Sequence, residues 1–96
     1  MLVLFASGTA ATPPLPERAA WYDCLDAYAQ VAAAGRSSPT TIALEAMRTC
    51  SVERKQLQTK LWQSRVPSDN ERALRGLQEE DRAGARRVVE LVNRAR

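Results

Sequence analysis

Residues 17–50 read ERAAWYDCLDAYAQVAAAGRSSPTTIALEAMRTC. The apolar side chains of this segment recur at steps of three and four residues, which is the spacing of one face of an α-helix. A polar turn interrupts the pattern once, where Gly35 is expected to stop a first helix in a left-handed conformation. Ser38 then caps a second helix that begins at Pro39. The segment therefore predicts an antiparallel helical hairpin, with apolar faces formed by Ala20, Trp21, Cys24, Leu25, Tyr28, Val31 and Ala32 and by Ile42, Ala43, Ala46, Met47 and Cys50.

The two cysteines of the chain lie at matching heights in this hairpin. Cys24 precedes Ala34, the expected last residue of the first helix, by ten residues, and Cys50 follows Pro39 by eleven. At 1.5 Å of rise per residue, the two cysteines are about 15 and 16.5 Å from the turn. We therefore expect a structural disulfide between them, which forms in an oxidising compartment. In a reducing compartment the alternative is two buried thiols that act as small apolar residues.

The helical pattern continues on the C-terminal side of Cys50. The second helix keeps its apolar face to about residue 65, although Ser51 could begin a new helix, and Pro67 ends it. Ser68 and Glu71 have the spacing of a capping box. A third apolar face follows, formed by Leu74, Leu77, Ala85, Val88, Val92 and Ala95. No stretch of useful length alternates apolar and polar residues with a period of two, which is the pattern of a β-strand. The prediction is an all-α protein with three helices at about 17–34, 39–65 and 69–95, which form one domain over residues 17–96 and are built on a hairpin cross-linked by one disulfide.

The N-terminal segment has features of an export signal. Residues 1–11, MLVLFASGTAA, combine a short apolar block with small residues that suit cleavage by signal peptidase. A basic leading region is missing, so we interpret the segment as the remnant of a secretory signal peptide, with a disordered arm as the alternative. Residues 12–16, TPPLP, are interpreted as a Pro-rich spacer. These features predict a protein that is exported, either periplasmic or secreted.

The composition argues against catalysis. The chain of 96 residues contains no histidine, which is the commonest general base and metal ligand. Its two lysines are expected on an exposed face, so no serine has a plausible base beside it. The chain also lacks a glycine-rich phosphate loop, and its acidic runs are typical of solvated helix faces. We therefore predict a protein without catalytic residues, cofactor or metal ion, and without a segment long enough to span a membrane.

Positive charge is concentrated in the second half of the chain. Residues 1–50 contain three basic and four acidic side chains, whereas residues 51–96 contain eleven and seven, so the net charges of −1 and +4 sum to +3. In the third helix, most charged residues pair at a spacing of four with an opposite charge. Four arginines are expected to lack such a partner and to form a modest anion-attracting surface: Arg72, Arg82, Arg87 and Arg96.

Asp81 breaks the apolar pattern of the third helix. A helical wheel places it on the apolar side, where a buried carboxylate needs a cationic partner. Arg54 or Arg65 of the second helix could supply that partner. The alternative is a polar notch for a ligand, with the room provided by Gly84.

These features favour an exported, non-enzymatic helical protein that acts by binding another protein or by self-association. Leu44 and Trp62 lie on one side of the second helix, away from its main apolar face. Together with Arg72, Arg82 and Arg87 they form the expected contact surface, because aromatic and arginine side chains dominate binding interfaces. The alternative is a basic helical module that binds nucleic acid or another polyanion.

Overall fold

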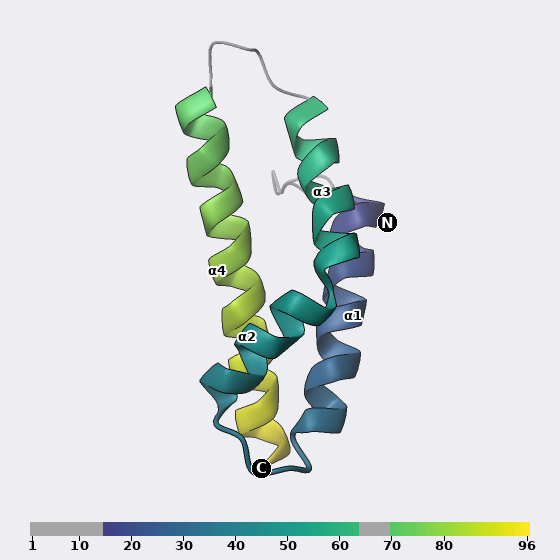
Figure 1. Cartoon of the computed structure of the whole chain (residues 1–96), viewed down its shortest axis with the longest axis vertical. Helices are drawn as coiled ribbons and strands as arrows, with labels where there is room; N and C mark the ends of the chain where they lie inside the picture. Colours follow the sequence, from purple (N-terminus) through teal and green to yellow (C-terminus); the bar gives the residue numbers. More distant parts are fainter. Residues whose placement is uncertain (1–14, 64–69) are drawn as a thin grey trace, which may run out of the picture.

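The structure is a computed structural model, which describes residues 15–63 and 70–96. This part of the chain is all-helical, as predicted, and contains four helices in the order α1 (Pro16–Ala32), α2 (Pro39–Thr49), α3 (Ser51–Gln63) and α4 (Asn70–Ala95). In Figure 1, α1 descends, α2 crosses obliquely at the bottom, and α3 rises beside α1. The long α4 descends on the left, passes behind α2 and packs against both α1 and α2.

The prediction of three helices is wrong, because the segment expected to form one helix over 39–65 is divided at Cys50. The backbone of Cys50 has φ −96° and ψ 29°, whereas ψ in an α-helix is about −42°. Ser51 therefore begins a new helix with a different axis, which is the alternative that the sequence left open. The second arm of the hairpin, which returns beside α1, thus consists of two successive helices, α2 and α3.

In the turn between α1 and α2, the end of α1 differs from the prediction and the start of α2 agrees with it. α1 ends at Ala32, and the amides of Ala34 and Gly35 bond to carbonyls three residues earlier, at 3.3 and 2.9 Å. These tight bonds satisfy the last carbonyls of the helix without a left-handed residue, so the expected role of Gly35 is wrong. At the start of α2, the Ser38 side chain accepts a hydrogen bond of 3.1 Å from the Thr41 amide, as a helix N-cap does.

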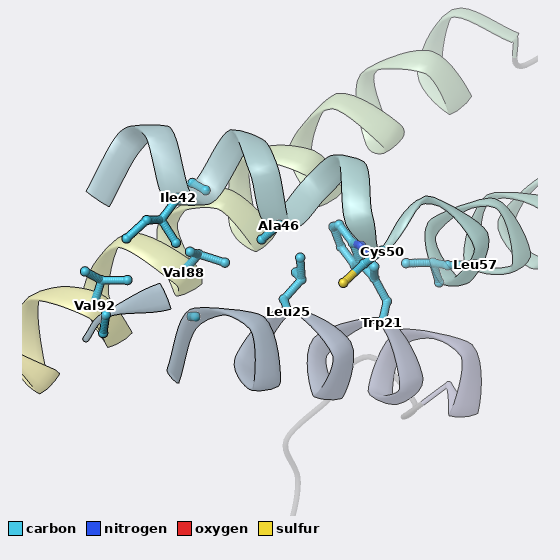
Figure 2. Packing of buried hydrophobic residues seen from close by; sticks show 11 residues of the cluster. Trp21, Leu25, Ile42, Ala46, Cys50, Leu57, Val88 and Val92 are labelled. Atoms are coloured by element: carbon cyan, nitrogen blue, oxygen red, sulfur yellow. The ribbon is translucent and has the colours of Figure 1, made fainter. Parts of the chain in front are cut away.

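The hydrophobic core lies where α1, α2 and the C-terminal half of α4 meet (Figure 2). Trp21 and Leu25 of α1, Ile42 of α2 and Val88 and Val92 of α4 are all completely buried. On α3 the core extends only to Leu57. The molecule is flat, with dimensions of 44 × 42 × 18 Å, so the far ends of α3 and α4 extend beyond this core.

The N-terminal expectations fall largely outside the described residues. These are the remnant of a signal peptide at residues 1–11 and most of the spacer at residues 12–16. Within the described part, Leu15 is extended and precedes α1, whose first residue is Pro16. The fixed φ of proline suits that position, where its missing N–H has no helical partner to lose.

Candidate functional site

The cysteine pair joins α1 to the break between α2 and α3. Cys24 and Cys50 form a disulfide in the structure, with their Cα atoms 6.0 Å apart. Cys50 is completely buried, and Cys24 packs against the core from its edge. Neither sulfur is in a position to act as a nucleophile, so the role of the pair is to hold the hairpin together.

Asp81 is paired with Arg54, one of the two predicted partners. The Nε and Nη2 atoms of Arg54 donate to Oδ1 and Oδ2 of Asp81 at 2.6 and 2.7 Å, which links α3 to α4. The expectation that Asp81 is buried is wrong, because both side chains are 35% exposed. The pair lies at the edge of the core, between the first turn of α3 and the middle of α4, where solvent reaches both side chains. The other candidate, Arg65, lies outside the described residues.

Gly84 provides space for a side chain of the protein itself. A Cβ atom at this position would lie 2.5 Å from Cη2 and 2.9 Å from Cζ2 of Trp21, and 3.2 Å from Cδ1 of Leu25. The indole of α1 therefore packs directly on the backbone of α4. The alternative of a notch open to a ligand at Gly84 is wrong.

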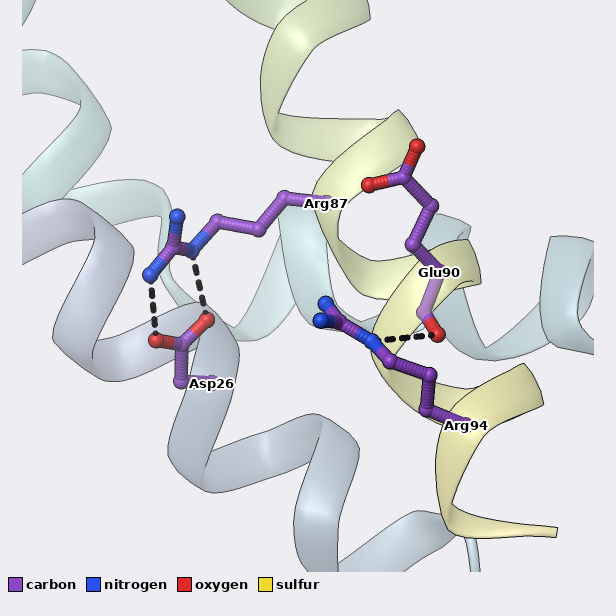
Figure 3. A network of polar contacts seen from close by, with 4 residues as sticks. All are labelled: Asp26, Arg87, Glu90 and Arg94. Atoms are coloured by element: carbon purple, nitrogen blue, oxygen red, sulfur yellow. Dashed lines mark hydrogen bonds and ion pairs between the residues drawn. The ribbon is translucent and has the colours of Figure 1, made fainter.

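Three of the four arginines expected to be free have partners in the structure. Arg87 forms two hydrogen bonds of 2.8 Å with Asp26 of α1 (Figure 3). Its guanidinium group also lies 4.6 Å above the ring of Tyr22. Arg82 pairs with Glu79 at 2.8 Å on the exposed face of α4. Arg96 donates to the backbone carbonyls of Ala33 and Gly35 in the turn after α1. The sequence prediction considered only pairs four residues apart within one helix, whereas Arg87 and Arg96 find partners about 60 residues away.

Arg18, which is not a member of that set, joins α1 to α4 through Glu80. Hydrogen bonds to their carboxylate partners raise the pKa values of Arg18, Arg54 and Arg87 above the ordinary arginine value. These guanidinium groups therefore remain charged at every physiological pH. Their charge is used to hold helices together. All four members of the expected anion-attracting set are exposed, and among the described residues Arg82, Arg87 and Arg96 have partners while Arg72 forms no ion pair.

Leu44 and Trp62, the two apolar residues of the expected contact surface, lie on different helices. Leu44 is 62% exposed on α2, and Trp62 is half-buried near the end of α3. The helical wheel that placed them on one side assumed a continuous helix, and the break at Cys50 removes that assumption. Trp62 instead lines a shallow groove along α3 with Lys55, Gln58, Thr59 and Gln63.

The structure reveals an apolar region at the far ends of α3 and α4, which we call the α3–α4 tip and define as residues 58–63 and 71–77. None of its described side chains is buried. Leu74 is 52% exposed, and Trp62 and Leu77 are partly exposed. The sequence analysis assigned Leu74 and Leu77 to a packed helix face. The burial pattern shows instead that the described residues cover this face only in part at the tip.

The described residues contain no obvious chemical centre. Over 15–63 and 70–96 there is no group of three or more Cys, Asp or Glu side chains arranged to hold a metal ion. None of the helices described is both long and apolar enough to cross a bilayer. Comparisons with protein-family models, with curated proteins and with solved structures give no match. Function is therefore inferred from the surfaces of the chain itself.

Proposed function

We propose that this chain is an exported, non-enzymatic helical protein that acts by binding protein, either a second copy or another chain, through the α3–α4 tip. The observation that carries the proposal is the half-exposed Leu74, which lies with Leu77 and Trp62 at an end of the molecule that buries none of its described side chains. Full burial of a leucine side chain contributes about 1.5–3 kcal/mol. Because Leu74 is already about half covered, a partner that covers the tip would gain part of this free energy from it.

The residue types at the tip suit a protein partner. Tryptophan is enriched among the residues that dominate binding energy, especially where it fills a pocket surrounded by residues that exclude water. Trp62 lies in the groove on α3 with the polar side chains of Gln58 and Gln63 beside it. This combination of an apolar centre and a polar rim is typical of interfaces that form between folded proteins.

The alternative, a module that binds nucleic acid or another polyanion, has less support. Arg18, Arg54 and Arg87 are held by carboxylates, so they offer little net charge to an external polyanion. A polyanion site also needs cations clustered on one face. The disulfide supports the location proposed here, because such a bond persists in an oxidising compartment such as the periplasm or the extracellular space.

The experiment compares Trp62→Ala and Leu74→Ala with the unaltered protein. Self-association is measured by size-exclusion chromatography with light scattering over a range of concentrations, and capture of partners by pull-down from the exported fraction. Both substitutions should weaken association at least tenfold without changing the melting temperature greatly, because the side chains are not part of the core. Val52→Ala is the matched control, since Val52 is 64% exposed on α3 but outside the tip.

Two outcomes would contradict the proposal. One is association, or capture of a defined protein, that is equally strong in the two tip variants and in the control. The other is a monomer that captures no protein but binds heparin or single-stranded DNA with an affinity that falls steeply with salt, which would favour the polyanion alternative.

A further inference from the structure

Trp21 carries a polar group that its surroundings in the core do not satisfy. Its side chain is completely buried, and the indole Nε1 has no hydrogen-bond partner. Leaving a buried N–H donor unpaired costs about 1–3 kcal/mol. Buried polar groups in folded proteins almost always have a partner, either a protein atom or an ordered water.

A small cavity lies beside this indole, where α1, α3 and α4 meet. Trp21 lines the cavity from α1. The polar side chains that line it are Arg54 and Gln58 of α3 and Glu80 and Asp81 of α4. Its volume is about 10 Å³, which is close to the least that holds one water molecule. A water site needs room and two or more polar partners, and both are present here.

The orientation of the indole directs its N–H toward this cavity. The ring edge formed by Cζ2 and Cη2 packs against Gly84 of α4. In an indole, Nε1 is attached to the ring carbon next to Cζ2, so the N–H lies on the side of the ring that faces α4. Glu80 and Asp81 lie one turn before Gly84 on that helix. The donor and the carboxylates therefore border the same small space.

We propose that this cavity is a binding site for a single structural water, which accepts a hydrogen bond from Trp21 Nε1 and donates to the carboxylates of Glu80 and Asp81. An indole N–H only donates, so its partner must accept, which rules out a cation. Two neighbouring carboxylates disfavour an anion. Water accepts and donates, and each carboxylate oxygen has a second lone-pair site beyond the one used by Arg18 or Arg54.

The proposed water connects the core to the polar edge of the molecule. Arg54 and Asp81 link α3 to α4, and Arg18 and Glu80 link α1 to α4. The water would join both ion pairs to the buried indole and so fix the position at which the three helices meet. This inference does not depend on the α3–α4 tip or on any partner.

The test uses the full chain, uniformly labelled with ¹⁵N, because its two tryptophans give only two indole N–H resonances. The Trp62→Phe variant assigns them. The Trp21 indole proton should show a cross-peak to water in NOESY and ROESY spectra with signs that report a long-lived water, together with slow hydrogen exchange. The half-buried Trp62 is the internal comparison and should exchange faster.

Two results would overturn the proposal. The first is a slowly exchanging Trp21 indole proton without a cross-peak to water. The second is a crystal structure in which Nε1 donates directly to the side chain of Gln58, Glu80 or Asp81. In a crystal structure of Trp21→Phe, which keeps an aromatic ring but removes the donor, the water should be lost. Its retention there would also count against the assigned role of the indole.

Discussion

At the scale of single residues, Gly84 is the position where the absence of a side chain matters most. Its α-carbon faces the ring of Trp21, which occupies the place where a Cβ atom would lie. The sequence analysis noticed this glycine but interpreted the space as room for a ligand. Only the packing of α1 on α4 shows that the indole fills it.

We predict that Gly84→Ala destabilises the protein. The added Cβ would lie 2.5 Å from Trp21 Cη2, so the buried indole must shift, and overpacking of this kind costs about 1–3 kcal/mol. Gly76→Ala on the same helix is the control, because Gly76 is partly exposed and alanine gains up to about 1 kcal/mol of helix propensity. Chemical denaturation of both variants measures the difference. Two equally stabilised variants would contradict the close packing.

Asp81 gives a second prediction at this scale. Asp81→Ala should lower the free energy of unfolding by about 1 kcal/mol, because it removes a bidentate partner of Arg54 at a site that solvent still reaches. A double-mutant cycle with Arg54→Ala isolates the energy of the pair. Glu79→Ala is the comparison, since the Glu79–Arg82 pair is about two-thirds exposed and should contribute less. A coupling energy of zero between Arg54 and Asp81 would show that their contact does not stabilise the fold.

At the scale of elements, the break between α2 and α3 organises the molecule. Cys50 is the last buried residue before the break, and it is bonded to Cys24 of α1. The disulfide thus fixes the point at which the returning chain changes direction. From there α3 runs beside α1, while α2 packs against the C-terminal half of α4.

We predict that the disulfide supplies a large part of the stability. For a separation of 26 residues, loop entropy gives about 3.5 kcal/mol, and a small core offers little to replace it. Reduction should add two hydrogens to the intact mass and markedly lower the melting temperature, and Cys24→Ser should have a similar effect. Unreduced protein from its native compartment should not react with thiol reagents. Labelling of both cysteines there would contradict the bond.

At the scale of the whole molecule, the thin shape explains why an apolar end stays uncovered. Four helices in a body 18 Å thick cannot enclose all of a helix as long as α4, which has 26 residues. The C-terminal half of α4 packs against α1 and α2, while among the described helices only α3 lies beside its first turns. The exposure of Leu74 follows from this arrangement.

The proposed export predicts where the mature chain begins. When the protein is expressed with its natural start in its own cells, the exported form should begin near Ala11 or Thr12, because small residues suitable for cleavage precede this point. Sequencing of the N-terminus of the exported protein measures this. A mature chain that retains residues 2–5, with amides protected from hydrogen exchange, would contradict the interpretation as a signal peptide.

The sequence alone determined the local features of this protein. Apolar spacing of three and four residues predicted the helical class, the Ser38 cap placed the start of α2, and the heights of Cys24 and Cys50 predicted their bond. The charge of Asp81 at an apolar position predicted a cationic partner, and Arg54 was among the candidates. The first three depend on residues within a few turns of one another or on a simple length along two helices, and the fourth depends on the need of a carboxylate on an apolar helix face for an opposite charge.

The tertiary structure alone decided the features that depend on distant residues. The division at Cys50 follows from a backbone angle in the middle of an otherwise helical pattern, which propensity does not reveal. The partner of Arg87 lies on α1, the carbonyls that bind Arg96 lie in the turn after α1, and the indole at Gly84 comes from α1. The uncovered end of α4 is determined by where the other helices stop. A helical wheel shows which face of α4 is apolar, but only the packed molecule shows how much of that face is covered.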